Sequence, residues 1–515
     1  MNKNVFSTTK QSKVPATNTV NEAGGVAYLL PDAAALAQYA MTGTFNGTFY
    51  ASAEDLTSKV LELANRCDPA FVANLAIYSR AHGYMKDMPA VLVAVLLARR
   101  ETAQFRRAFR GAIDDLKMVK NFVQAVRSGI TGRKSLGSAA KNEVRRFFDL
   151  QSELDLFRGS IGNDPSLADV IKMVHPRPAN PVRANMYAYL LGKKYAANML
   201  PPEVRDFEAF KLNPNGAPPA VNFQFLSSIK MSPEQWQHLA GSMTWHTLRM
   251  NLNTLERNGA LADSDTVDMI AKKLADRETI KKIKVFPYQI FAAYKNAVSA
   301  PPKVRLALQD ALDVAVENVP EIGKAIIAVD ISGSMGSPAT GNRGTATSSV
   351  TCVEVGSLIA SAFLRKNPES MVIPFNTSAE TVDLNPRDSV VTNAQKMSRM
   401  LGGGTACSAA LQKANLLNLK ADMVFYVSDN ESWADFGTGS GSAMAEQWAK
   451  FKRRNPKAKL VLLDIQPYAS SQVQTDKDVL NVGGFSDTVF EVVAQFAKGE
   501  TSGEHWVNII NNMEQ

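Results

Sequence analysis

Oxygen-bearing side chains gather after two predicted strands and one glycine loop. A D-I-S-G-S sequence directly follows the apolar run 324–329, a threonine follows three glycines at 402–404, and a carboxylate closes the apolar run 423–427. Carboxylate and hydroxyl oxygens suit a hard divalent cation in an octahedral shell. We therefore expect one Mg²⁺ or Mn²⁺ ion, held by Asp330, Ser332, Ser334, Thr405 and Asp429.

Hydroxyl ligands would coordinate this ion without neutralising it. With only two carboxylates, Asp330 and Asp429, the ion stays electrophilic and keeps a position open for a carboxylate or phosphate of a partner. The simpler alternative is that Asp330, Ser332 and Ser334 only cap a helix. Capping does not explain why three separate segments meet at one edge of the predicted sheet.

The elements that position these residues form a pattern of alternating strands and helices. Parallel strands place their carboxyl ends at one edge, where α/β domains bind their ligands. Residues 321–515 are therefore predicted to form a doubly wound α/β domain. The expected strands are 324–329, 371–375, 423–427 and 460–463, and the expected helices are near 349–365, 407–417, 443–454 and 486–497.

The preceding residues, 26–320, carry a helical pattern almost throughout, after a polar arm at 1–25 that we expect to be extended. Helices recur every 15 to 25 residues or so without long strands, which is typical of stacked HEAT-like or armadillo-like pairs. A globular helical bundle is the alternative. The expected helices are 69–82, 88–100, 103–126, 138–149, 185–198, 232–240, 245–258, 265–275, 286–297 and 302–315.

Charge is distributed unevenly along the 515 residues, whose net charge is +8. Residues 1–320 contain 40 Lys and Arg against 29 Asp and Glu, and residues 321–515 contain 17 against 20. Within 101–200 the excess is 17 basic over 9 acidic residues. A concentrated positive field favours a polyanionic partner. The alternative for any single lysine is a solvated helix surface.

The remaining composition limits the class of protein. A hydrophobic fraction of 45% excludes wholesale disorder, and three cysteines exclude a disulfide framework or a four-cysteine zinc site. The apolar run 88–98 is about half of the roughly 20 residues that cross a bilayer. We expect a cytoplasmic protein that does not contact the membrane.

Seven residues of the helical part are candidates for contact with phosphates or bases. Lys141 and Arg145 have helical i, i+4 spacing and so share one face. His175 precedes a proline in a predicted loop, where its ring could stack on a base. The complete set is Arg133, Lys134, Lys141, Arg145, Arg158, Lys172 and His175.

The strand-end residues resemble the metal-ion-dependent adhesion site of von Willebrand factor A (vWA) domains. The helical half resembles the Ro autoantigen, or TROVE-domain, RNA-binding proteins, and its bacterial members in particular. The motifs of the helical half are YSRAHG at 78–83, MP at 88–89, GRKSLG at 132–137, VHPRP at 174–178, MTW at 243–245, LRMNL at 248–252 and FPY at 286–288. The ending SDNE at 428–431, in the α/β half, also looks more like this family than like adhesion-receptor A domains.

This resemblance implies a ring of HEAT-like helices closed by a vWA domain. It also implies small structured noncoding (Y-like) RNA on the outer surface, single-stranded 3′ ends of aberrant RNA in the central hole, and a role in RNA quality control or degradation. Bacterial members are associated with exoribonucleases such as polynucleotide phosphorylase. A ring closed within one chain implies a monomer. One departure is segment 152–165, which is short and offers only Arg158, so the outer RNA site is expected to be reduced.

Enzyme signatures are not apparent in the sequence. There is no phosphate loop, no G-x-S-x-G and no H-E-x-x-H, and two carboxylates are few for a two-metal nuclease. We therefore predict a scaffold that is not an enzyme. The alternative function is a metal-dependent protein-adhesion module whose helical half is a docking solenoid.

Overall fold

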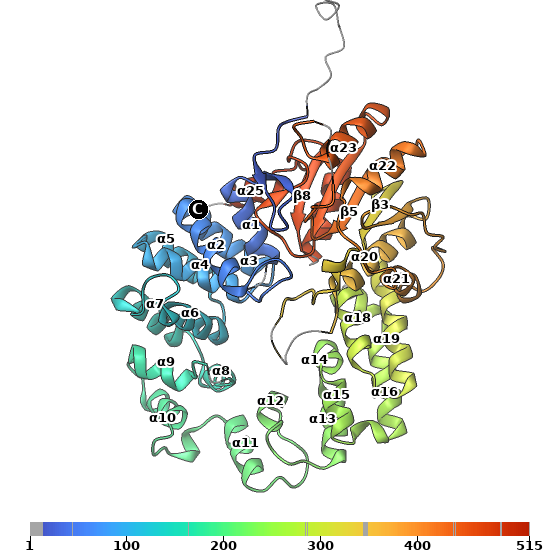
Figure 1. Ribbon diagram of the computed structural model, residues 1–515. Coiled ribbons are helices and arrows are strands. Elements are labelled where there is room, and N and C mark those ends of the chain that lie inside the picture. The colour runs from blue at the N-terminus through green and yellow to red at the C-terminus, as the bar shows by residue number, and fades with distance from the viewer. Residues whose placement is uncertain are drawn as a thin grey trace, which may run out of the picture. The chain divides into compact units, whose positions relative to one another are not determined.

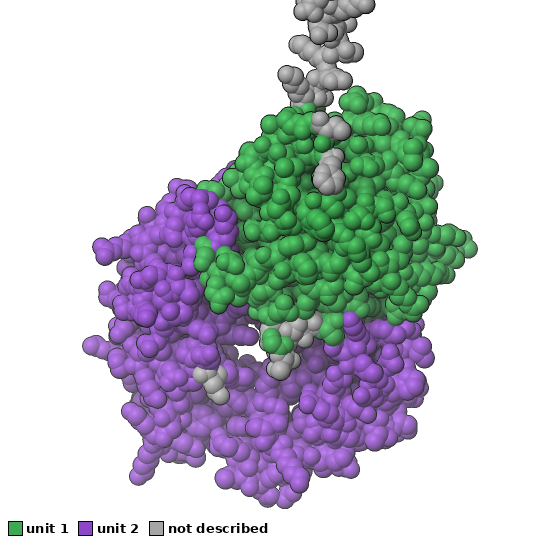
Figure 2. All heavy atoms as spheres, in the orientation of Figure 1, with its two compact units in different colours: residues 1–58, 284–292, 312–508 green, residues 59–283, 293–311, 509–515 purple. Residues whose placement is uncertain are grey.

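The computed structural model describes residues 14–513, except 44, 163, 284, 286, 343, 345–348, 436, 438, 485 and 486. The chain is divided into two compact units (Figure 2). Unit 1 contains residues 1–58, 284–292 and 312–508, and unit 2 contains residues 59–283, 293–311 and 509–515. These units do not follow the linear boundary at residue 320, because the described residues of segment 14–58 pack with the α/β part.

Unit 1 is built on a five-stranded parallel sheet in the order β4-β3-β5-β6-β8. The strands are β3 (Ala325–Asp330), β4 (Met371–Phe375), β5 (Met423–Ser428), β6 (Lys459–Asp464) and β8 (Val479–Gly483). Strands β3 and β5 are neighbours, with Val329 opposite Val427. The four predicted strands are confirmed, and β8 is additional. The polar Asn481 at its centre interrupts the apolar pattern by which the other strands were predicted. This side chain is nevertheless buried and donates a hydrogen bond to the carbonyl oxygen of Val473.

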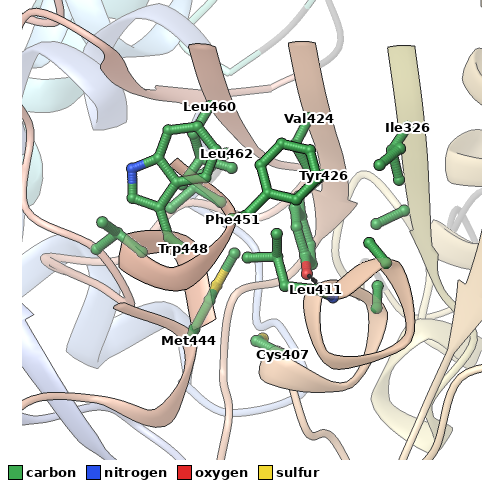
Figure 3. Packing of buried hydrophobic residues seen from close by; sticks show 14 of the residues in the cluster. Ile326, Cys407, Leu411, Val424, Tyr426, Met444, Trp448, Phe451, Leu460 and Leu462 are labelled. Atoms are coloured by element: carbon green, nitrogen blue, oxygen red, sulfur yellow. Dashed lines mark hydrogen bonds between the residues drawn. The ribbon is translucent and has the colours of Figure 1, made fainter. Parts of the chain in front are cut away.

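Helices cover both faces of this sheet (Figure 1). On one face, Leu411, Met444 and Trp448 pack against Tyr426 and Leu462 of the strands (Figure 3). The Tyr426 hydroxyl accepts a hydrogen bond from the Leu411 backbone amide, so the phenol is buried without losing its partner. The helices of this unit are α1 (Asp32–Thr42), α20 (Cys352–Lys366), α21 (Val390–Ser398), α22 (Ser408–Leu416), α23 (Ala443–Arg454) and α24 (Asp487–Lys498).

A small antiparallel sheet ties the N-terminal segment to unit 1. Strand β2 (Val26–Leu29) pairs with β1 (Thr19–Val20) on one side and with β7 (Ser470–Ser471) on the other. The predicted extended arm is thus paired from Thr19 onward. A pairing between residues more than 400 positions apart leaves no local signal in the sequence.

Unit 2 is helical. Its helices are α3 (Pro69–Ala81), α4 (Asp87–Ala98), α5 (Thr102–Ala112), α6 (Leu116–Ser128), α7 (Gly137–Asp149), α8 (Glu153–Gly159), α9 (Leu167–Val174), α10 (Pro181–Leu190), α11 (Pro202–Leu212), α12 (Phe223–Leu226), α13 (Pro233–Ser242), α14 (Trp245–Met250), α15 (Leu252–Arg257), α16 (Ser264–Leu274) and α17 (Arg277–Ile283). Four helices contain residues of both units: α2 (Ala53–Arg66), α18 (Pro287–Asn296), α19 (Pro302–Ala315) and α25 (His505–Asn511).

The predicted helix 103–126 is wrong as a single element. The structure breaks it between α5 and α6, where the Asp115 carboxylate accepts a hydrogen bond from the Met118 amide at 2.7 Å and caps the second helix. The predicted helix 185–198 is displaced, because α10 begins at Pro181 and stops at Leu190. The prediction 245–258 likewise becomes α14 and α15.

Neighbouring helices of unit 2 pack in succession: α3 on α4 and α5, α5 on α7, and α6 and α7 on α9. The predicted combination of a helical part and an α/β part is confirmed, whereas closure into a ring stays a prediction. Phe286 of the FPY motif lies outside the described residues. Within the described ranges, no helix combines the length and hydropathy needed to cross a bilayer.

Candidate functional site

Neighbouring strands carry the two carboxylates of the candidate metal site. Asp330 is the last residue of β3, and Asp429 follows the last residue of β5. Both side chains are buried, at 0% and 2% exposure. The Asp330 Oδ2 atom accepts a hydrogen bond of 2.6 Å from the Ser428 hydroxyl. The strand pairing alone therefore brings together two carboxylates that are 99 positions apart in sequence.

The loop after β3 supplies two hydroxyls. The Ser332 amide donates to Asp330 Oδ1 at 2.8 Å, which turns the chain back over the carboxylate. The hydroxyls of Ser332 and Ser334 lie 3.2 Å apart, and both side chains are buried. The Ser334 hydroxyl also lies near Asp429 and acts to lower the pKa of this carboxyl. The predicted D-I-S-G-S loop thus turns its three polar side chains toward one point.

Thr405 arrives at the same place from the glycine loop. Gly403 has φ of +82°, and its carbonyl oxygen accepts from the Gly333 amide at 3.0 Å, which fixes this loop against the one after β3. The Thr405 side chain is 1% exposed, and its Oγ1 atom has no hydrogen-bond partner. A buried oxygen without a partner costs about 1–3 kcal/mol, which a bound cation would recover.

Burial raises the pKa of both carboxyls. Desolvation is the largest cause for Asp330, the charge of Asp429 adds to it, and together they raise the Asp330 pKa to about 7. Desolvation also raises the pKa of Asp429. Among the described residues, neither carboxylate forms an ion pair with Lys, Arg or His. Two close acids without a counter-charge favour a bound cation.

Two further acids lie near this edge of the sheet. Glu431 and Asp464 are buried and have pKa values raised by desolvation and by neighbouring carboxylates. Glu431 accepts a hydrogen bond from the Ala23 amide and thereby holds the N-terminal segment. Among the described residues, no three His, Cys, Asp or Glu side chains are arranged to hold a metal ion. The donor set is therefore two carboxylates with hydroxyls, which fits Mg²⁺ or Mn²⁺ and not zinc.

Four of the seven candidate RNA contacts present their charged groups on exposed helix ends or loops of unit 2. Lys134, Arg158, Lys172 and His175 are exposed. Arg158 and Lys172 have only long ion pairs with their helix neighbours Asp155 and Asp169, at 3.7 and 3.9 Å. His175 ends α9 in the left-handed conformation, with φ of +50°. Lys141 is partly buried on α7.

The other two candidates, Arg133 and Arg145, donate hydrogen bonds to backbone carbonyls. The Arg133 guanidinium donates to three backbone carbonyls, those of Leu97, Ser135 and Leu136, at 2.7–3.2 Å. The Arg145 Nε atom donates to the Val174 carbonyl at 2.6 Å and so joins α7 to the end of α9. Both guanidinium groups bind backbone carbonyls. The other five candidates, Lys134, Lys141, Arg158, Lys172 and His175, are therefore better placed to meet phosphates.

A cluster of arginines on α5 and α7 escaped the sequence prediction. The buried Glu143 carboxylate receives two hydrogen bonds of 2.9 Å from Arg110, and Arg106 and Arg146 approach it at 3.7 and 3.9 Å. Each arginine side chain remains about half exposed. The local signal was limited to Arg146, three residues after Glu143, because Arg106 and Arg110 lie on a different helix.

Comparison with known proteins covers both parts of the chain. The family model described as the Ro60 vWA domain matches residues 324–497. The RNA-binding protein RO60 of Deinococcus radiodurans is 26% identical over 93% of this chain and 95% of its own length. The RNA-binding protein RO60 of Caenorhabditis elegans is 24% identical over 51% of this chain and 43% of its own length.

A solved structure supports the same fold. The crystal structure of the Deinococcus radiodurans Ro (Rsr) protein has a TM-score of 0.64 and 18% identity, and the match covers 92% of this chain and all of that one. The resemblance predicted from short motifs is thus confirmed along nearly the whole chain, and the match to the Ro60 vWA model includes the strand-end motif.

Proposed function

We propose that this chain, a relative of the Ro proteins with a Ro60 vWA domain, is an RNA-binding scaffold and not an enzyme. The observation that carries the proposal is the similarity to an RNA-binding protein over 93% of the chain. The excess of 17 basic over 9 acidic residues in 101–200 supports it. Lysines and arginines hold phosphates without reading sequence, so RNA shape and single-stranded ends would provide the preference.

The phosphate-binding surface of this proposal is formed by α7, α9 and the loops beside them. Lys134, Lys141 and Lys172 supply charge that the fold does not use for backbone contacts, and His175 supplies a ring beside them. Arg158 on α8 extends the charge toward the short segment 152–165. We expect fluorescence anisotropy to show binding of a small structured RNA that weakens steeply with salt.

The decisive variant replaces Lys134, Lys141 and Lys172 together by Ala. It should lower the slope of log K against log salt by about 0.9 for each lost phosphate contact. A matched control replaces Lys420, Lys450 and Lys457, which are exposed on unit 1, and should leave the slope unchanged. Equal effects of the two triple variants would place RNA elsewhere, and salt-insensitive binding would refute the scaffold.

The RNA classes follow from the Ro resemblance. We propose a small structured, Y-like RNA on the outer helical surface and single-stranded 3′ ends of aberrant RNA in the hole of a monomeric ring, with a cytoplasmic role in RNA quality control. An exoribonuclease such as polynucleotide phosphorylase is the corresponding partner. Crosslinking followed by RNA sequencing should enrich both RNA classes, and copurification should recover the nuclease only while RNA is intact.

We also propose that Asp330, Ser332, Ser334, Thr405 and Asp429 hold one Mg²⁺ or Mn²⁺ ion. The buried carboxylate pair without a counter-charge and the unpartnered Thr405 oxygen support this assignment. The ion would supply a strong point charge that joins three loops at the edge of the sheet. Because these residues lie in unit 1, RNA affinity should survive Asp330→Ala, which separates the two proposals experimentally.

A further inference from the structure

The segment between α1 and α2 lies against the loop that follows β3. The Asn46 side-chain amide donates to the Thr340 carbonyl at 3.0 Å. The Asn342 amide donates to the Gly47 carbonyl at 2.8 Å, in a short antiparallel bridge. All of these residues belong to unit 1. Segment 45–51 is therefore held beside the candidate metal site by one side-chain and one backbone hydrogen bond, neither of which involves the proposed ligands.

Side chains fix the orientation of the same segment. The Thr48 hydroxyl lies 2.8 Å from the hydroxyl of Tyr468. The Tyr50 ring meets the Tyr468 ring edge to face, with centroids 6.3 Å apart, and Phe49 packs on Tyr50 at 4.8 Å. Edge-to-face aromatic pairs define ring positions closely. Tyr50 is thus a placed residue, half-buried, whereas Phe49 is 57% exposed.

The Tyr50 phenol reaches the proposed ligand groups themselves. Its hydroxyl lies near the hydroxyls of Ser334 and Thr405, and both of these neighbours lower the Tyr50 pKa, although neither approach has hydrogen-bond geometry. A cavity of about 330 Å³ remains at this place, and its walls include Phe49, Tyr50 and Trp433 as well as Ser334 and Thr405. The Trp433 ring closes on the glycine loop, because a Cβ atom on Gly404 would lie 2.7 Å from it.

We propose that Tyr50 is an internal partner of the metal site. Its hydroxyl contributes an oxygen to the surroundings of the ion where an open adhesion site would receive a carboxylate from another protein. The site is then capped by its own chain, and the ion joins segment 45–51 to the edge of the sheet. This inference rests on the proposed metal site and is independent of RNA binding.

Mn²⁺ titration followed by electron paramagnetic resonance tests the proposal on the full-length protein. Asp330→Ala establishes the signal of the site. Tyr50→Phe keeps the ring and removes only the hydroxyl, so we expect Mn²⁺ affinity to fall by about tenfold, which is typical when a supporting polar group is lost. The matched control, Tyr28→Phe, removes a hydroxyl that donates to the Pro15 carbonyl and has no contact with segment 45–51, and it should change the affinity less than about twofold.

Amide hydrogen exchange supplies a second readout. Mn²⁺ should slow exchange in segment 45–51 of the wild type and not in Tyr50→Phe. Equal Mn²⁺ affinity and equal protection in wild type and Tyr50→Phe would overturn the role of Tyr50. Equal Mn²⁺ binding by wild type and Asp330→Ala would overturn the metal site and this inference with it, while RNA affinity measured in parallel would still report on the scaffold. The melting temperature without metal confirms that each variant folds.

Discussion

Buried carboxylates occur in two contrasting settings in this molecule. Glu143 in unit 2 is 5% exposed and is surrounded by Arg106, Arg110 and Arg146. Asp330 and Asp429 in unit 1 are at least as buried, but their neighbours are hydroxyls and backbone amides and not arginines. Proteins pair buried charges or bind a metal ion with them. In the first setting the protein itself supplies the positive charge, whereas in the second none of the described residues does.

The contrast shows how to separate structural charge from functional charge. Arginines that surround an acid, or that cap backbone carbonyls as Arg133 does, already have electrostatic partners. Functional sites are expected where buried polar groups have no hydrogen-bond partner or counter-charge, as with the hydroxyl oxygen of Thr405. The same criterion favours Lys134 and Lys172 over Arg133 and Arg145 as phosphate contacts.

The largest expected effect is the loss of metal stabilisation in Asp330→Ala. At a Mg²⁺ or Mn²⁺ concentration of about 100 times its Kd, binding should add about 2.7 kcal/mol to the free energy of unfolding of the wild type and nothing to that of the variant. Thermal denaturation with and without EDTA measures this difference. As a control, Asp464→Asn changes another buried acid at the same edge and should keep the metal effect. Equal metal effects in wild type and Asp330→Ala would remove the contrast between the two settings.

Glu143→Gln probes the other setting. The substitution leaves three arginines around a neutral amide, and the free energy of unfolding should fall by about 2 kcal/mol. This is less than for a fully buried pair, because each arginine can rehydrate. Urea denaturation provides the value, and Mg²⁺ should not restore it. A variant as stable as the wild type would show that the arginine cluster contributes charge but no stability.

The pH dependence of the metal-free protein should sharpen the comparison. Folding raises the pKa of Asp330 to about 7 from its usual value near 4, so between these pH values the folded state binds more protons than the unfolded state. Stability without metal should therefore fall as the pH rises through this window, by up to about 1.4 kcal/mol per pH unit, and added Mg²⁺ should oppose the fall. Asp330→Asn should flatten the profile measured in EDTA. A wild-type profile as flat as that of Asp330→Asn would show that Asp330 does not titrate in this range.

The sequence predicted the convergence of the candidate metal-site residues better than it predicted which basic side chains remain available on the candidate RNA surface. The D-I-S-G-S loop and Asp429 follow apolar runs, and parallel pairing of β3 with β5 forces their ends together, so local pattern and topology were sufficient. Thr405 was identified by its glycine loop. Tyr50 was missed, because nothing near residue 50 indicates a contact with residues 334 and 405, which depends on long-range packing.

Charge density along 101–200 was visible in the sequence, but the partner of each charge was not. The spacing of Lys141 and Arg145 correctly placed both on one helix, α7. It could not show that the Val174 carbonyl accepts a hydrogen bond from Arg145, because these residues are 29 positions apart and lie on different helices. Similarly, β8 was missed because Asn481 interrupts its apolar pattern.

The smallest effect separates two adjacent residues. Arg133→Ala removes three hydrogen bonds to backbone carbonyls and should lower the free energy of unfolding by about 1 kcal/mol, since the side chain is only partly buried. Lys134→Ala should change this energy by less than about 0.5 kcal/mol, because its ammonium group is on the surface. RNA anisotropy should rank the same variants in the opposite order, with Lys134→Ala lowering the salt slope by about 0.9 and Arg133→Ala leaving it unchanged. If Arg133→Ala lowered both the free energy of unfolding and the salt slope, a guanidinium bound to carbonyls would still contact RNA. Partners seen in the fold would then not distinguish structural from functional charge on this surface.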